Sequence, residues 1–201
     1  TTLFYNDSYL QSIGNVENDK AIGYWEFYNE NGSAKSEGGF DNDEREGKWT
    51  WFNDKGRINS VALYTKGKLE GDYFSYHDNG KVDVIANYKE DKLEGEYKSY
   101  NEKGALVQKK FFKEGELNGV YESYFAVGED ILEYSVPYSE GLIHGNFVEY
   151  YSNGDVYSEV MFIKGKKDGV QKSYHTNGKI YSEITYLDGT LNGSYKYYYP
   201  N

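Results

Sequence analysis

The sequence predicts an all-β protein: an elongated single-layer antiparallel sheet, twisted or curved, built from tandem β-hairpins. Three observations support this fold class. Glycines recur with a period of 24 residues, aromatic side chains recur at fixed positions between them, and an Asn-Gly or Lys-Gly pair stands midway through most repeats. A fixed period in the range of about 20–50 residues is typical of arrays in which each repeat packs only against its neighbours.

Each repeat begins at a glycine, and positions within it are numbered as columns from that glycine. Successive opening glycines are 24 residues apart, except for one interval of 26. They are Gly23, Gly47, Gly71, Gly95, Gly119, Gly145, Gly169 and Gly193. They define full repeats at 23–46, 47–70, 71–94, 95–118, 119–144, 145–168 and 169–192, a partial degenerate repeat at 1–22 and a partial repeat at 193–201. We therefore expect residues 1–201 to form one repeat array.

The first half of each repeat has the pattern of a strand followed by a tight turn. Column 6 is aromatic in every copy, from Tyr28 to Tyr198, and column 3 is aromatic in every copy except Gln171. Column 10 is always glycine: Gly32, Gly56, Gly80, Gly104, Gly128, Gly154 and Gly178. Asn-Gly between two aromatic, β-branched runs predicts a hairpin, because both residues tolerate the positive φ of a type I′ turn. Each repeat is therefore predicted to be a β-hairpin closed by such a turn.

The second half has the pattern of a returning strand that ends in a second turn, as in residues 66–71. Pairing across a two-residue turn places column 3 opposite column 16 and column 6 opposite column 13. Columns 3 and 6 then point to opposite faces, because strand side chains alternate. A bulge near the opening glycine would instead turn both columns to one face. Repeat 119–144 has two extra residues between Gly128 and Tyr138, where we expect a longer hairpin end or a bulge.

Composition and charge exclude several classes of function. The formal charge is −11, with 33 acidic against 22 basic residues, which disfavours nucleic acids and anionic membrane surfaces. There is no cysteine and no apolar stretch long enough to cross a bilayer, so we expect no transmembrane segment. The chain begins at Thr1 without an initiator Met, and we expect the native N-terminus to be missing.

Residues that could carry chemistry are better explained by the repeat. His77 and His175 share column 7 but are four repeats apart, and His144 is in a turn, so solvated histidines are expected. Four acids fall in column 15 when counted from the opening glycines: Glu37, Glu133, Glu159 and Glu183. Their spacing along a sheet is too wide for a retaining glycosidase pair. The acidic loop of Asp41, Asp43, Glu44 and Glu46 lacks the ordered spacing of an EF-hand. We expect no catalytic residue, no metal and no cofactor.

The repeat pattern resembles a known family. Gly-x-aromatic-x-x-Tyr-x-x-Asn-Gly-x-apolar, followed by aromatic-x-x-Gly-x-Leu-x-Gly, is similar to bacterial MORN-repeat variants, which occur in the YwqK-type antitoxin family. The resemblance covers residues 3–201. It implies β-hairpins laid side by side and a binding role, such as an immunity protein, scaffold or envelope protein. It implies no catalytic residues, and it leaves the bacterial cytoplasm, the cell envelope and secretion open.

Candidate binding residues are aromatics that the repeat does not require. Columns 5, 7 and 13 are mostly polar but become aromatic at Trp51, Phe125, Tyr151, Tyr157, Tyr181, Tyr197 and Tyr199. Tyrosine and tryptophan are frequent binding anchors because they give a large contact area at low entropy cost. The alternative is additional cross-strand packing.

The leading hypothesis is a non-enzymatic protein-binding module, specifically an immunity or antitoxin-like protein whose acidic sheet binds a basic partner. The first alternative is a carbohydrate-binding or adhesive cell-surface protein, since equivalent rings recur at ~10 Å along such a sheet. The second is a structural scaffold that assembles edge to edge as a homo-oligomer through unpaired end strands.

Overall fold

The computed structural model describes residues 2–5, 9–126 and 130–200, and it is all-β over these residues. The chain divides into an N-terminal unit, residues 1–95 and 102–104, and a C-terminal unit, residues 96–101 and 105–201. The described residues form no helix, and so none that could span a membrane.

The strands of the N-terminal unit are β1 (Thr2–Tyr5), β2 (Tyr9–Glu17), β3 (Lys20–Tyr28), β4 (Ala34–Asp41), β5 (Glu44–Phe52), β6 (Ile58–Thr65), β7 (Lys68–Tyr76), β8 (Val82–Lys89) and β9 (Lys92–Leu93). Those of the C-terminal unit are β10 (Gly95–Tyr100), β11 (Leu106–Lys113), β12 (Glu116–Leu117), β13 (Gly119–Tyr124), β14 (Leu132–Ser139), β15 (Leu142–Ile143), β16 (Gly145–Tyr150), β17 (Val156–Ile163), β18 (Lys166–Lys167), β19 (Gly169–Tyr174), β20 (Ile180–Leu187) and β21 (Thr190–Tyr197).

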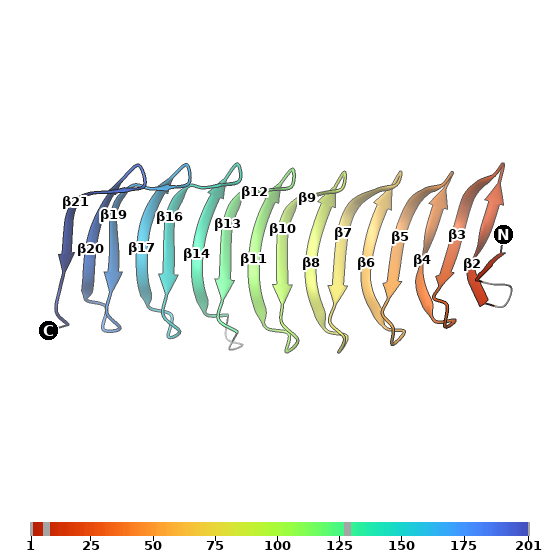
Figure 1. Ribbon diagram of the computed structural model, residues 1–201, viewed down its shortest axis with the longest axis horizontal. Coiled ribbons are helices and arrows are strands. Elements are labelled where there is room, and N and C mark those ends of the chain that lie inside the picture. The colour runs from red at the N-terminus through yellow and green to blue at the C-terminus, as the bar shows by residue number, and fades with distance from the viewer. Residues whose placement is uncertain (1, 6–8, 127–129, 201) are drawn as a thin grey trace. The chain divides into compact units, whose positions relative to one another are not determined.

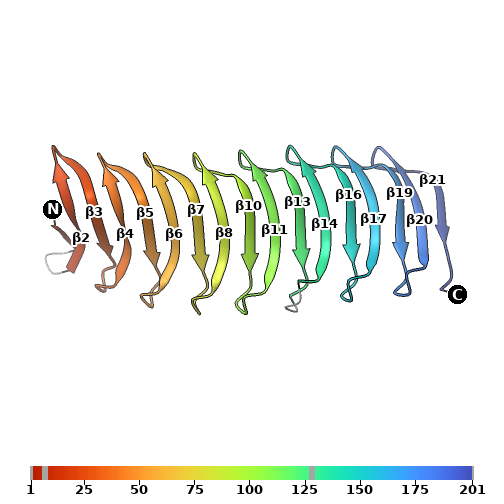
Figure 2. The same ribbon diagram turned by 180° about the vertical axis from the view of Figure 1, so that it is seen from behind.

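Each unit is a single-layer sheet of antiparallel hairpins, as predicted. In the N-terminal unit, β3 pairs with β4, β4 with β5, β5 with β6 and so on along the chain. Within each unit the column-10 turns lie along one edge and the second turns along the opposite edge (Figures 1 and 2). Neither sheet closes into a barrel by pairing of its first and last described strands.

The turn types differ from the prediction. Asn31 does not have a positive φ, whereas Gly32 does, at 81°. Asn29 N–H donates to Ser33 O at 2.8 Å and Gly32 N–H to Asn29 O at 2.9 Å. This is a three-residue loop built on a type I turn followed by a left-handed glycine. The predicted type I′ turn at Asn-Gly is therefore wrong; Asn31 contributes its side chain instead, whose Oδ1 accepts from Ser33 N–H at 3.0 Å.

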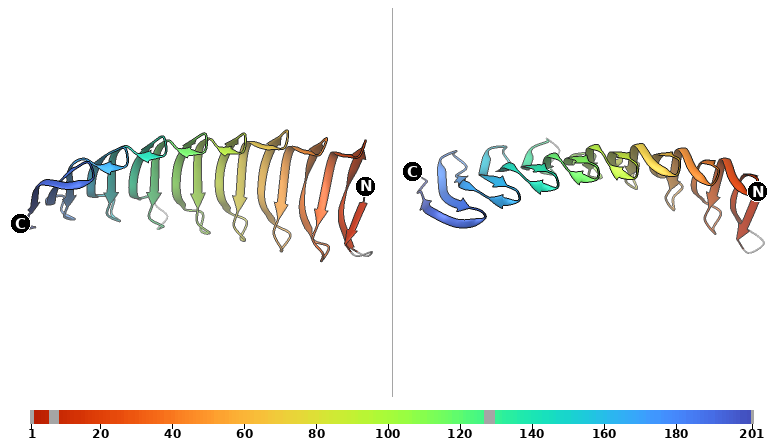
Figure 3. Two further views of the ribbon diagram at one scale, coloured as in Figure 1. Left: turned by 45° about the horizontal axis from the view of Figure 1, so that its top comes forward. Right: turned by 90° about the horizontal axis from the view of Figure 1, so that it is seen from above.

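Type I′ turns occur at the second turn of the repeat. There both central residues have positive φ, as at Asn42 (52°) and Asp43 (73°) and at Lys66 (50°) and Gly67 (77°). These two-residue loops match the right-handed twist of the strands that they join. Figure 3 shows them following one another along one edge of each unit.

The insertion in repeat 119–144 lengthens a hairpin end, as predicted. Phe125 N–H donates to Ile131 O at 2.9 Å, a span two residues longer than that from Asn29 to Ser33. Gly128, the predicted turn glycine of this repeat, lies outside the described residues.

The register confirms one predicted pairing and corrects the other. Column 3 lies opposite column 16, as in Tyr73 with Ala86. Column 6 lies opposite column 12 and not column 13, as in Tyr76 with Val82, because the three-residue loop leaves column 13 as an unpaired bulge. In repeat 119–144 the same shift makes Glu133 the bulged residue, so its assignment to column 15 was wrong.

Columns 3 and 6 lie on opposite faces. A bulge does occur near the opening glycine, between the pairs Tyr64–Leu69 and Ala62–Tyr73. It precedes column 3, however, and the ladder continues without a break from Gly71 to Ser75. Both faces therefore carry aromatic columns. We call them the column-3 face, which also holds columns 5, 14, 16 and 18, and the column-6 face, which also holds columns 2, 4, 15 and 17.

The core lies on the column-3 face, where large rings cover small residues. Trp49 is only 1% exposed, and its ring lies against Gly38, its partner on the neighbouring strand. A Cβ at Gly38 would be 2.4 Å from the indole ring. Gly14 has the same relation to Trp25, whereas Ala62 pairs with the smaller Tyr73. The size of the column-16 residue is thus matched to the size of the column-3 ring that pairs with it in the next repeat.

We predict that Gly38→Ala destabilises the protein by about 1–3 kcal/mol, because the added methyl group overpacks against the Trp49 ring. In a Trp49→Tyr background, Gly38→Ala should lower the free energy of unfolding by less, because the next repeat already packs an alanine, Ala62, beside a tyrosine, Tyr73. Chemical denaturation of the four proteins of this double-mutant cycle measures the coupling, expected at about 0.5–3 kcal/mol. Equal costs in the two backgrounds would contradict the packing described above.

Candidate binding surface

Columns 5, 7 and 13, which supplied the predicted binding residues, meet at one place on the repeat. Columns 7 and 13 flank the column-10 turn of one hairpin. Their side chains contact each other in two repeats. The ring centroids of Tyr151 and Tyr157 are 5.1 Å apart, and those of His175 and Tyr181 are also 5.1 Å apart. Column 5 of the following hairpin lies beside them, as Tyr197 does beside Tyr181 at 5.3 Å. The bulge makes this meeting possible, because it frees column 13 from the strand ladder.

In the C-terminal unit this place is filled by rings. We define the tyrosine cluster as two groups of rings in consecutive repeats: the pair Tyr151 and Tyr157, and the group of Tyr181, Tyr195, Tyr197 and Tyr199 with His175. Tyr151 and His175 are half-buried, whereas the other rings are largely open to solvent, from 42% exposed at Tyr157 to 88% at Tyr199. A groove of about 340 Å³ lies between His175, Tyr181 and residues 197–200. Tyr151 is anchored, since its hydroxyl donates to Tyr174 O at 2.7 Å.

The two remaining predicted residues lie elsewhere. Phe125 occupies column 7 of the repeat before Tyr151 and is half-buried, and it shares none of the ring contacts recorded for the described residues. Trp51 belongs to the N-terminal unit, where it lines a second groove of about 490 Å³. The structure therefore places five of the seven predicted residues in the two groups of the tyrosine cluster and leaves two outside them.

Arg45 is a functional candidate that the sequence did not indicate. Its guanidinium carbon lies 4.6 Å from the Trp49 ring centroid, 5.6 Å from that of Trp51 and 5.3 Å from that of Tyr64. Nη1 also donates to the Tyr64 hydroxyl at 3.2 Å. Arg45 stands in column 23, where most repeats have leucine, and this departure is the signal that could have identified it.

On the column-6 face, tyrosine hydroxyls bond to glutamates. Tyr174 donates to Glu159 at 2.6 Å and Tyr198 to Glu183 at 2.8 Å, each from the repeat that follows the acid. The bond to Glu159, with some burial, raises the pKa of Tyr174 to about 12. The same bond lowers the pKa of Glu159. These column-15 acids therefore join consecutive repeats through an ionised carboxylate.

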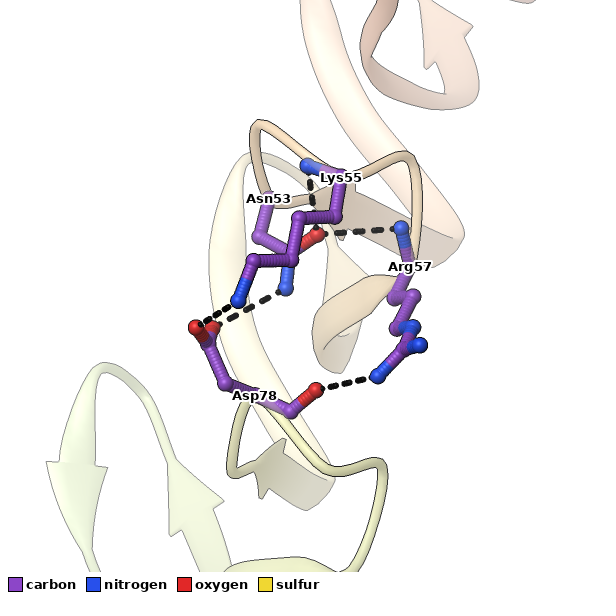
Figure 4. A network of polar contacts seen from close by, with 4 residues as sticks. All are labelled: Asn53, Lys55, Arg57 and Asp78. Carbon is purple, nitrogen blue, oxygen red and sulfur yellow. Dashed lines mark hydrogen bonds and ion pairs between the residues drawn. The ribbon is translucent and has the colours of Figure 1, made fainter.

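Charged side chains also link consecutive turns at the column-10 edge. Figure 4 shows Asp78 accepting from Lys55 Nζ at 2.7 Å and from Asn53 Nδ2 at 3.2 Å, while Arg57 donates to the Asp78 carbonyl at 2.7 Å. The bond to Lys55 holds the pKa of Asp78 below its ordinary value. Such exposed pairs contribute little stability individually, so their main effect is to align adjacent turns.

The acids of residues 41–46 serve the second turns. Asp43 Oδ1 accepts from Ala21 N–H at 2.7 Å, and Glu46 Oε2 accepts from Lys66 N–H at 2.8 Å. His144 occupies the same column as Glu46, and its Nδ1 accepts from Lys164 N–H at 3.4 Å. Among the described residues, no group of three or more His, Cys, Asp and Glu side chains is arranged to hold a metal ion.

Comparison with known families identifies the repeat. Four segments, residues 69–90, 93–114, 143–164 and 167–188, match the MORN repeat variant. No curated protein matches the chain. The chain thus contains repeats of the MORN type, which suggest a repeat-based binding module.

We predict that Glu159→Gln lowers the pKa of Tyr174 from about 12 toward the ordinary value of about 10. A raised pKa in the folded state gives stability that is complete below pH ~10 and is lost as the pH rises through ~12. The variant should therefore lose less stability over this alkaline window. Tyrosine-resolved NMR titration measures the shift, and Glu149→Gln, in the same repeat, is the control. Titration of Tyr174 at the same pH in all three proteins would contradict the assignment.

Proposed function

We propose that the chain is a non-enzymatic protein-binding module that uses the tyrosine cluster as its contact surface. The observation that carries this proposal is that the rings of Tyr157, Tyr181 and Tyr197 are exposed and each contacts another ring, at columns whose aromatic character the repeat does not require. Rings held by their neighbours lose little further freedom on binding, so more of their contact energy contributes to affinity.

The distribution of charge supports a basic partner. The tyrosine cluster lies within residues 145–201, which contain six acidic and six basic side chains. Residues 1–144 contain 27 acidic and 16 basic ones. The acidic repeats would attract a cationic partner at long range, and the neutral tyrosine cluster would hold it at short range. Salt should then slow association much more than it speeds dissociation.

An immunity or antitoxin-like role is the more specific form of this proposal, with a basic bacterial toxin as the partner. Such a protein must bind its target tightly and inhibit it without catalysing a reaction. Large, rigid aromatic anchors and electrostatic attraction are the features that produce fast and long-lived protein association.

We predict that replacing Tyr157, Tyr181 and Tyr197 by serine raises the dissociation rate of the partner at least about tenfold, because hot-spot rings carry most of the binding energy. The partner is first captured from an extract of the source cells and identified by mass spectrometry, and its binding is then measured by surface plasmon resonance at low and high salt. Tyr24→Ser, at a tyrosine 54% exposed outside the cluster, is the matched control.

An acidic partner would contradict the proposed electrostatics. Rates that stay the same in the triple variant but change in the Tyr24→Ser control would contradict the choice of contact surface.

A further inference from the structure

The N-terminal unit has a groove whose lining differs in chemistry from that of the tyrosine cluster. It has a volume of about 490 Å³, within the range typical of small-molecule sites. Three successive repeats contribute to it, in part through columns 3, 5, 7 and 13, which also form the tyrosine cluster. Its walls include Lys35, Trp51, Asp54, Asn59, Tyr64 and Tyr73.

Trp51 differs from the other two tryptophans in its hydrogen bonding. Trp25 Nε1 donates to Ile22 O at 3.2 Å, and Trp49 Nε1 donates to Gly39 O at 2.9 Å. Within the described residues, Trp51 Nε1 has no such acceptor. Trp25 and Trp49 are 7% and 1% exposed, whereas Trp51 is half-buried and borders the groove. Indole N–H groups usually find a partner when they leave water, so a ligand here would meet a free donor beside a flat ring.

Three polar side chains of the groove are likewise unengaged. Lys35, Asp54 and Asn59 are exposed and make no hydrogen bond or ion pair with any residue that the structure describes. Together they offer an ammonium donor, a carboxylate acceptor and an amide that both donates and accepts. Their formal charges cancel, so this lining favours a neutral ligand over an anion or a cation.

Arg45 fixes the aromatic wall of the groove. Its guanidinium lies over the Trp49, Trp51 and Tyr64 rings at 4.6–5.6 Å from their centroids. Cation–π contacts of this kind contribute a modest stabilisation and hold the rings in place.

We propose that this groove binds a neutral oligosaccharide. The apolar C–H face of a sugar ring would stack on Trp51, and its hydroxyl groups, which both donate and accept, would bond to Asp54, Asn59, Lys35 and the free indole N–H. Nucleotides are disfavoured because the groove presents a single unpaired ammonium beside a carboxylate. This ligand is distinct from the protein partner proposed for the tyrosine cluster.

The test uses the whole chain and four neutral probes: cellotetraose, chitotetraose, maltotetraose and xylotetraose. Indole N–H resonances of the three tryptophans are followed by NMR during titration. At least one sugar should shift the Trp51 resonance saturably and leave those of Trp25 and Trp49 in place. Asp54→Ala with Asn59→Ala should weaken that binding about tenfold or more, because two hydrogen bonds are lost.

Glu30→Ala is the matched control, since Glu30 is an exposed acid in the same column as Asp54 but outside the groove. Thermal unfolding verifies that each variant folds, and Lys35→Met provides a second polar deletion if the double variant does not. The proposal is overturned if none of the four sugars shifts Trp51, or if the groove variants and Glu30→Ala bind equally well. A shift produced only by a lysine-rich peptide would assign the groove to a protein partner and also overturn it.

Discussion

A single-layer sheet must bury its aromatic rings against itself, and this constraint governs the packing of each repeat. Among the residues that the structure describes, no helix or second sheet covers the column-3 face in either unit. The rings therefore lie against the strands beside them, and Trp49 reaches 1% exposure only because Gly38 has no side chain. Column 16 consequently holds glycine, alanine or valine beside most of the column-3 rings, such as Val160 beside Phe147. Hydrophobic burial is obtained between neighbours in sequence, which is why the repeat period is so regular.

The loop at column 10 has a consequence for binding. Its three residues leave column 13 out of register, so that this side chain turns toward column 7 of its own hairpin and column 5 of the next. Columns 7 and 13 are not needed for the column-3 core, and their chemistry changes from repeat to repeat. The pair is Tyr151 with Tyr157 in one repeat and His77 with Asp83, 3.6 Å apart, in another. Variation is therefore tolerated where it can create a binding surface.

The hairpins and the pairing of columns 3 and 16 could be predicted from the sequence, because alternation and glycine spacing depend on local geometry alone. The sequence left open whether columns 3 and 6 share a face, because that depends on where the bulge near the opening glycine falls. The turn types could not. Asn-Gly satisfies a type I′ turn, but it also satisfies a type I turn in which Asn31 accepts from Ser33 N–H, and only the register separates the two. Where column 9 is lysine, Asn53 in column 7 takes over this role, a substitution visible only once the loop is known.

The candidate surfaces were partly predictable for a related reason. Aromatic departures from the repeat pointed to the tyrosine cluster, since a ring that the core does not need is conspicuous in an otherwise regular sequence. Arg45 and the unengaged Lys35, Asp54 and Asn59 were not found this way, because charged and amide residues are expected at any exposed position. Their significance depends on having no partner while lying beside Trp51, which is a property of the folded chain. Columns 5, 7 and 13 thus contribute to a ring-lined groove in one unit and, together with other columns, to a mixed polar and aromatic groove in the other. Because columns 7 and 13 vary without changing the packing of columns 3 and 16, the repeat can present different binding chemistries on a common backbone.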